Sequence, residues 1–340
     1  MSKVFFIGRF PPPYGGATIK SKILYNMLKE EFEVDKFDTE LKNKNKLLFS
    51  FKLIEFILKN KKNYGVICIA SVSLFKLTKI ISIINKRMLE RISVFAIGGA
   101  LDEMILLNNI SVDLLKKYKV IYVECNGCKD KLNKMGLNNV EVIPNFRVKP
   151  EKREFRLNTN EGLRCVFISR IDISKGVNKI IDAFRELDNK YNIDFYGPIE
   201  KSIELEFIKN INELNNANYK GIINSSDNKI YDLISSYDLL IFPSEWKGEG
   251  YPGIIAEAKI AGIPIISSNF KYAKEIIMHY KDGIIMKNNT VDELRSLLIE
   301  LQENKKLLNS IRIESFKSGE KCIIDNYKEI IIGRINKEGK

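Results

Sequence analysis

Short apolar runs alternate with longer amphipathic stretches along the whole chain. The runs, which begin with "KVFFIG" at residue 3, are rich in Val, Ile and Phe. Near-continuous runs of this kind are typical of strands buried on both faces of a parallel sheet. The predicted strands cover residues 3–8, 32–38, 64–70, 92–98, 119–124, 140–145, 164–170, 192–197, 218–223, 239–244, 263–268 and 283–286.

Helical patterns between these strands predict two series of βαβ units, and 340 residues is long for a single core. The polar stretch 145–162 separates the series and predicts a linker with a surface strand. We therefore expect an α/β fold of two Rossmann-like, doubly wound domains, 1–147 and 148–318, with a C-terminal helix over 319–340 that returns toward the first domain. Two such domains facing each other would form a cleft, which is a common small-molecule site.

The composition is that of a globular protein, with 45% hydrophobic and 10% aromatic residues. The longest apolar runs fall far short of the ~18 residues that span a bilayer, and the N-terminal run is too short for a signal-peptide core. These features favour a cytoplasmic protein. Cys125 and Cys128 form a lone CxxC, and His279 is the only histidine, so we expect reduced structural thiols and no zinc site.

The net charge of +12 lies entirely in the first half of the chain. Residues 1–150 hold 26 Lys and Arg against 14 Asp and Glu, whereas residues 151–340 hold 29 of each. The asymmetry predicts an anionic partner for the first half. Seven of the lysines fall in the apolar segment 42–62, which fits either a core helix with solvated flanks or an interfacial helix on an anionic membrane. No nucleic-acid motif is present, so nucleic acid is not expected.

Two loops could hold an anion. The first, "GRFPPPYGGAT" at residues 8–18, places Gly15 and Gly16 before a helical pattern, where backbone N–H groups are available to a ligand. It also fits a proline-stiffened surface turn, and it lacks the dinucleotide pattern G-x-G-x-x-G. In the second, "SRIDISKG", Arg170 and Lys175 flank a loop before a helix, as a diphosphate clamp would require or as two solvated charges would allow.

The stretch "EGYPGIIAEAKIAG" carries the most specific pattern. Pro252 suits the first turn of a helix over 252–261, and Gly262 suits its end. Glu249 then precedes the helix N-terminus, and Glu257 lies roughly 7 Å along the axis. The helix N-terminus could hold phosphates while the carboxylates accept hydroxyl hydrogen bonds, for example from a ribose. The alternative is a capping glutamate beside an unrelated helical one.

In this order and spacing, "PPPYGGA", "VIPN", "SRIDISKG", "EGYPGIIAEA", "GIPIISS" and "DGIIM" resemble the family-4 retaining glycosyltransferases of the GT-B fold. The resemblance covers nearly the whole chain and is strongest over 164–287. It implies sugar transfer from a nucleotide-diphosphate donor. It also implies the following roles for this sequence. Arg170 and Lys175 hold the diphosphate, Glu257 binds the ribose, and Glu249 faces the donor sugar with the backbone of Gly250, Tyr251, Pro252 and Gly253 nearby. Gly15 and Gly16 approach the phosphates, and Ile222 and Ile223 lie by the base.

The chain departs from this family at two places. Within "EGYPGIIAEA", Pro252 and Gly253 stand where relatives often have glycine and then another residue, so a different local backbone is expected. Many relatives carry a histidine after the fourth strand, near the acceptor, where this sequence reads "VFAIGGALDE". Asp102 or Glu103 could serve the acceptor instead. Asp-x-Asp, the metal-binding pattern of the alternative sugar-transferase fold, is absent from the sequence. Because Arg170, Lys175 and a helix dipole could stabilise the leaving diphosphate, we expect no metal and no further cofactor.

The leading hypothesis is a metal-independent, retaining glycosyltransferase of the hexosyltransferase type. It would act on a glycan acceptor, lipid-linked at an anionic membrane surface, in bacterial capsule, O-antigen or exopolysaccharide synthesis. GT-B enzymes with lipid-linked acceptors often dock through the first domain, which favours a peripheral membrane location. The alternatives are a nucleotide-sugar epimerase of GT-B architecture, which would normally use histidines, and a non-catalytic nucleotide-sugar-binding protein.

Overall fold

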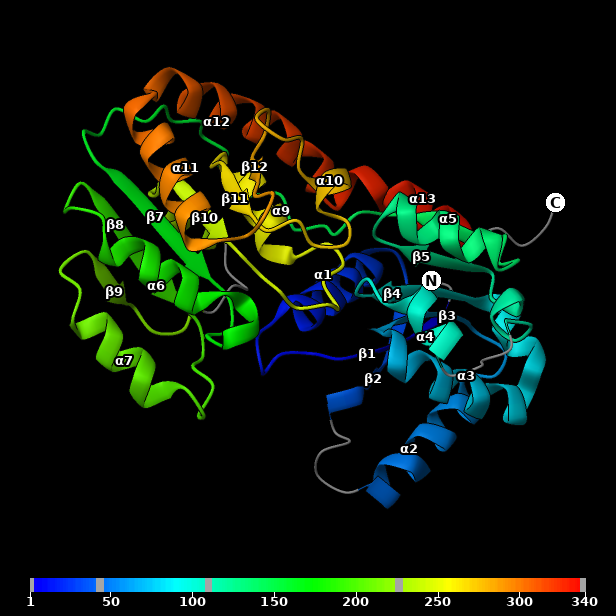
Figure 1. Cartoon of the computed structure of the whole chain (residues 1–340). Helices are drawn as coiled ribbons and strands as arrows, with labels where there is room; N and C mark the ends of the chain where they lie inside the picture. The colour runs from blue at the N-terminus through cyan, green and yellow to red at the C-terminus, as the bar shows by residue number, and fades with distance from the viewer. Residues whose placement is uncertain (1–2, 41–45, 108–111, 224–228, 337–340) are drawn as a thin grey trace. The chain divides into compact units, whose positions relative to one another are not determined.

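The computed structural model describes residues 3–40, 46–107, 112–223 and 229–336 (Figure 1). The chain forms two units, each with a hydrophobic core of its own. The first unit comprises residues 1–148 and 324–340, and the second comprises residues 149–323. Each unit contains one six-stranded sheet whose strands pair in parallel.

The first unit is a doubly wound sheet in the order β2-β1-β3-β4-β5-β6. The chain passes from β1 outward to β2 and returns to the other side of β1 with β3, so the strand order reverses between β1 and β3. Its strands are β1 (Lys3–Gly8), β2 (Glu33–Asp38), β3 (Tyr64–Ala70), β4 (Ile92–Ile97), β5 (Val120–Val123) and β6 (Val140–Val142). Its helices are α1 (Gly16–Glu31), α2 (Lys46–Lys59), α3 (Ser71–Asn85), α4 (Leu101–Leu107), α5 (Asn126–Lys134) and α13 (Asp325–Asn336).

The second unit repeats this plan in the order β12-β11-β10-β7-β8-β9, with its reversal between β7 and β10. Its strands are β7 (Leu163–Ile168), β8 (Tyr191–Tyr196), β9 (Ala217–Tyr219), β10 (Leu239–Phe242), β11 (Ile265–Ser267) and β12 (Ile284–Ile285). Its helices are α6 (Val177–Arg185), α7 (Glu204–Asn212), α8 (Lys229–Ser235), α9 (Gly253–Ala261), α10 (Ala273–Ile276), α11 (Val291–Glu303) and α12 (Lys305–Gly319).

The apolar runs that predicted the strands supply the side chains of the two cores. In the first unit, Phe6, Cys68 and Phe95 from three neighbouring strands pack with α1 and with Ile331 of α13. In the second unit, Phe167 and Phe195 pack with α6, α7, α11 and α12. All twelve predicted strands are present, and several end earlier than predicted. β10 stops at Phe242 because Pro243 has no N–H group to donate to the sheet.

The surface strand predicted within 145–162 was wrong. The structure has no strand there, because this backbone bonds to side chains of α12 instead of to a neighbouring strand. Asn309 accepts from the N–H of Asn158 at 2.8 Å and donates to its carbonyl at 3.1 Å, and Arg312 donates to the carbonyl of Arg156 at 3.1 Å. The segment is therefore ordered along α12 without being part of a sheet.

The cysteines are structural, as the sequence predicted, and the histidine also has a structural role. All five cysteines are buried, and none of them forms a disulfide. Burial raises the pKa of the Cys68 thiol to about 11. His279 is exposed, and its Nδ1 accepts a hydrogen bond from the N–H of Ile285 at 3.0 Å, so it holds the short strand β12. Of the residues that the structure describes, none belongs to a helix long and apolar enough to cross a membrane.

The segment 46–59 forms the helix α2, and most of its apolar side chains are not in a core. Only Leu53 and Ile57 are buried. Phe49 and Phe56 are half-buried against Phe37, at 5.5 and 5.3 Å between ring centroids. A fully packed core helix is therefore the wrong description of the predicted segment 42–62, whose residues 42–45 lie outside the described part of the chain.

Candidate active site

The carboxyl edge of the second sheet gathers the charged residues that the sequence singled out. β7 leads into Arg170 and Lys175, and β10 leads into the loop that carries Glu249. These two strands are neighbours, and the strand order reverses between them. In open α/β sheets, ligands bind outside the carboxyl ends of the strands at such a reversal. Fold topology alone therefore places both loops at the expected ligand position of this unit.

Lys175 and Glu249 meet directly in an ion pair. Lys175 Nζ donates to Glu249 Oε1, and the two side chains are only 13% and 11% exposed. Gly176 explains how Lys175 reaches this place. Its φ of +75° lies in the left-handed region, and a Cβ there would clash with the Pro243 carbonyl oxygen. Only glycine allows the loop after β7 to pack so closely on the end of β10.

Glu249 is held by a second donor that was not predicted from the sequence. Ser244 Oγ donates to the same oxygen, Oε1, at 2.7 Å, and Ser244 is itself buried. Trp246, half exposed in the same loop, has its ring centre 5.8 Å from Lys175 Nζ. The stretch "FPSEW" held a signal for these residues, because polar and aromatic groups directly after a buried strand lie at the carboxyl edge. Both donors on Oε1 fix the orientation of the carboxylate.

Arg170 pairs with a different carboxylate, that of Asp172. Its Nε donates to Asp172 at 2.5 Å, and its side chain is 54% exposed. Burial of Asp172 opposes ionisation, but hydrogen bonds from Ser174 and Arg170 outweigh it, so the pKa of Asp172 lies below its ordinary value. Asp172 thus stays charged at neutral pH and orients the Arg170 side chain at the edge of the sheet.

Helix α9 begins next to Glu249. Pro252 is the N-cap residue, one position before the helix proper, and Gly262 closes the helix in the left-handed conformation, as predicted. The first N–H groups of a helix have no intrahelical partners and favour anions. Glu257 lies in the second turn of α9 and is 4% exposed. The loop 249–252 and the α9 N-terminus therefore offer a carboxylate and backbone donors at one place.

A buried ion pair fixes the far part of α9. Lys259 Nζ contacts Asp282 Oδ2 at 2.6 Å and the carbonyl of Ile276 at 2.6 Å, with both charged side chains at most 4% exposed. Asp282 comes from the "DGIIM" stretch that carried part of the family resemblance. Its role in the structure is to hold α9, so this motif supports the site without touching it.

The remaining predicted donor residues lie at the same edge or in the first unit. Ile222 and Ile223 follow β9, and Ile222 is 65% exposed. The Tyr251 hydroxyl is 3.2 Å from Cys322 Sγ, within the second unit. Gly15 caps α1 in the first unit, and a Cβ at Gly15 or Gly16 would meet nothing within 4 Å, so packing does not demand glycine there. Their predicted approach to the phosphates stays a prediction.

The two acceptor-side candidates differ in exposure. Asp102 lies in α4, is 3% exposed, and forms an ion pair with Lys131 at 3.3 Å. Glu103, its neighbour, is exposed. A buried carboxylate is poorly placed to receive a proton from an acceptor hydroxyl, and the role of either residue at the acceptor stays a prediction.

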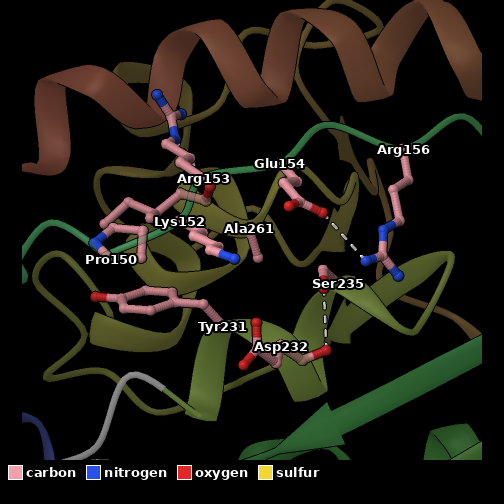
Figure 2. Close-up of a pocket in the computed structure, with 10 residues that line it drawn as sticks. Pro150, Lys152, Arg153, Glu154, Arg156, Tyr231, Asp232, Ser235 and Ala261 are labelled. Carbon is pink, nitrogen blue, oxygen red and sulfur yellow. Dashed lines mark hydrogen bonds and ion pairs between the residues drawn. The ribbon is translucent and has the colours of Figure 1, made fainter.

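A separate cavity of about 240 Å³ lies at the other end of α9 (Figure 2). It is lined by the segment after residue 149, by Tyr231 and Asp232 of α8, and by Ile260. Arg153 Nε donates to the Ile260 carbonyl at 3.0 Å, and its guanidinium lies 4.0 Å from the ring centre of Phe316. This arrangement anchors the linker, and a helix length of about 12 Å separates it from Gly253. It is not part of the candidate site.

The second half of the chain matches a known protein family. Residues 148–318, half of the sequence, match the family model "Glycosyl transferases group 1". The chain belongs to this family. The match covers the whole carboxyl edge described above, from Arg170 to Glu257, and it confirms the resemblance that the motifs predicted.

The curated proteins that resemble this chain align with it over only part of their own length. An N,N'-diacetylbacillosaminyl-diphospho-undecaprenol alpha-1,3-N-acetylgalactosaminyltransferase of Campylobacter jejuni is 26% identical over 179 residues, 52% of this chain and 46% of that protein. A capsular polysaccharide biosynthesis glycosyltransferase of Staphylococcus aureus is 28% identical over 182 residues, 52% of this chain and 43% of that protein. Across the curated relatives, the chain spans between 40 and 67% of the relative's length.

Solved structures confirm the fold. The Anabaena protein HepE, solved in complex with UDP, superposes with a TM-score of 0.74 at 14% identity and covers 98% of this chain and 99% of its own. The likeness confirms the predicted GT-B architecture of two Rossmann-like domains.

Proposed function

We propose that this chain is a retaining glycosyltransferase that moves a sugar from a nucleotide-diphosphate donor to a glycan acceptor. The observation that carries the proposal is the convergence of Lys175, Glu249 and the α9 N-terminus at the strand reversal of the second sheet. Family membership agrees with it. The structure that superposes on this fold was solved with UDP, which supports a uridine or related nucleotide as the ligand class.

In this proposal each group has a distinct role. Lys175 and the α9 N-terminus stabilise the negative charge that develops on the leaving diphosphate, and Arg170 adds a second cation from the edge. Glu249 accepts hydrogen bonds from the donor sugar through the oxygen that Lys175 and Ser244 leave available. Glu257 accepts from the ribose. These groups supply the positive charge that a metal ion would otherwise provide, so we propose a metal-independent reaction.

For the acceptor we propose a lipid-linked glycan of a bacterial surface polysaccharide. The Campylobacter jejuni relative is named for a sugar on diphospho-undecaprenol, and the Staphylococcus aureus relative for capsular polysaccharide. The basic first half of the chain, with the exposed apolar side chains of α2, fits a protein that works peripherally on the anionic cytoplasmic face of a membrane.

The test is a donor-turnover assay. The purified chain is incubated with a panel of UDP-, GDP-, TDP- and ADP-sugars, and released nucleoside diphosphate is measured with and without EDTA. We expect slow hydrolysis of one class of donor, unaffected by EDTA and lost in Lys175→Ala. Interconversion of donor sugars without release would instead indicate an epimerase. No turnover of any donor, with or without crude lipid-linked acceptor, would overturn the proposed activity.

A further inference from the structure

A second cavity, of about 530 Å³, lies in the first unit between its sheet and the helices α2 and α3. Figure 1 shows α2 beside α3, and the two helices pack against each other. This volume is within the range of small-molecule sites. The donor residues discussed above all lie in the other unit, apart from Gly15 and Gly16, and neither of these two lines the cavity. The cavity is therefore a separate feature.

The cavity occupies the position where this sheet is expected to bind a ligand. It is lined by Ile7 at the end of β1 and by Ile69 at the end of β3. The strand order of the first sheet reverses between these two strands. It is thus the counterpart in the first unit of the edge that holds Lys175 and Glu249 in the second.

The lining is apolar inside and cationic toward solvent. Its apolar residues are Ile7, Phe49, Leu53, Ile69, Leu77 and Ile80. Lys46 and Lys76 also line it, and both are exposed. Arg9 and Glu40 line it as well and are paired with each other, so their charges offset and Lys46 and Lys76 leave the excess positive charge. An uncharged apolar ligand would make no ionic interaction with these lysines, and a free sugar would make no favourable contact with the apolar walls. A hydrocarbon chain attached to an anionic group matches both.

The outer surface of α2, which faces away from the cavity, also combines apolar and basic side chains. Phe51 is 68% exposed, Ile54 43% and Leu58 49%, although they sit on the helix that covers the cavity. Exposed apolar side chains on one helix beside basic residues are typical of a membrane interface. A lipid whose chain enters the cavity from that interface would keep both surfaces out of water.

We propose that this cavity binds the hydrocarbon chain of the lipid-linked acceptor, next to its phosphate, with Lys46 and Lys76 facing the phosphate. The assignment of the lipid as an acceptor rests on the proposed function. The binding of a phosphorylated hydrocarbon chain does not, because it follows from the cavity itself.

The experiment titrates the full chain with monomeric decyl phosphate, below its micelle concentration, by calorimetry. We expect saturable binding to one site. Each methylene added to the alkyl chain of the phosphate should strengthen binding roughly three- to fourfold until the cavity is filled. Ser73→Trp places a large side chain on the cavity lining from an exposed position of α3 and should weaken binding at least tenfold. Ile83→Trp is the matched control on the same helix, because Ile83 is 85% exposed and does not line the cavity.

A second pair of variants tests the phosphate. Lys76→Gln should weaken decyl phosphate roughly two- to fivefold and leave decanol unchanged, as for an exposed ion pair. Lys79→Gln, three positions on and outside the lining, should change neither. Thermal unfolding of each variant establishes that the fold is intact.

The outcomes separate the cavity from the proposed activity. If wild type does not bind decyl phosphate saturably, or if Ser73→Trp binds it as wild type does while folded, the cavity assignment is wrong, and donor turnover is unaffected. If decyl phosphate binds as expected but no nucleotide sugar is turned over, the lipid site stands and the glycosyltransferase proposal fails.

Discussion

The carboxyl edge of the sheet is polar in one unit and apolar in the other, although the two sheets have the same kind of topology. In the second unit the edge is polar: Lys175 and Ser244 both donate to Glu249, and the three side chains are largely buried. In the first unit it is an apolar cavity beside an incompletely buried helix, in a half of the chain with 26 basic and 14 acidic residues. The shared topology fixes where a ligand binds, and the side chains decide which ligand. We interpret one edge as built for a diphosphate sugar and the other for a lipid.

The charge contrast gives the largest expected effect. Replacing Lys42, Lys44, Lys46, Lys59, Lys61 and Lys62 by glutamine should weaken binding to anionic liposomes by about 6 kcal/mol, at about 1 kcal/mol each. Lys59 is paired with Asp35 at 3.1 Å, so its share should be smaller. Lys42 and Lys44 lie outside the described residues.

Co-sedimentation with neutral and anionic liposomes measures this loss. Binding should also fade with salt, because the Debye length is about 8–10 Å at physiological salt. The same number of surface lysines replaced in the second unit is the control. If the wild-type protein does not bind anionic liposomes at low salt, the first unit does not act at a membrane surface.

The next largest effect concerns the buried ion pair between Lys259 and Asp282 in the second unit. Lys259→Met leaves Asp282 buried without its partner and should lower the free energy of unfolding by about 3–5 kcal/mol. Chemical denaturation measures it, with the exposed Lys274→Met as control. A variant as stable as wild type would show that α9 does not depend on this pair.

At the donor edge, Lys175→Ala should lower turnover by ~10²-fold or more, because one group that stabilises the leaving diphosphate is lost. Lys179→Ala is the matched control. Lys179 also pairs with a glutamate, Glu245, but that glutamate is exposed. Steady-state kinetics on folded variants separates them, and equal activities would remove Lys175 from the active site.

Ser244→Ala should have the smallest effect of this series. It removes one of the two donors on Glu249 Oε1, at about 1.5 kcal/mol or roughly tenfold in kcat/KM. Ser236→Ala, on an exposed turn, is the control. If Ser244→Ala matches wild type, Lys175 alone orients the carboxylate.

Much of this arrangement could be predicted from the sequence, for identifiable reasons. Buried parallel strands need continuous apolar residues, so every strand of both sheets was visible. Gly262 marked the end of α9 because the left-handed conformation there suits glycine. Lys175 and Glu249 were both identified, but their direct contact was not, because it depends on how closely Gly176 lets two loops approach.

Other features depend on tertiary packing alone. Short pieces of the polar segment 145–162, such as 154–157, alternate polar and apolar residues like a strand, yet Asn309 and Arg312 form hydrogen bonds with its backbone. The segment 46–59 has the composition of a core helix, and only the structure shows Phe51 exposed and a cavity beneath the helix. Periodicity reports which residues are apolar, not whether a neighbour covers them.

The central claim is that the carboxyl edge of the second unit binds a nucleoside diphosphate sugar. The most direct measurement is thermal unfolding and calorimetric titration with a panel of nucleoside diphosphates and their sugars, for wild type and Glu257→Gln. We expect one nucleotide class to raise the unfolding temperature by mass action, with affinity weakened roughly ten- to hundredfold in Glu257→Gln. A wild-type protein that none of these nucleotides stabilises would contradict the account.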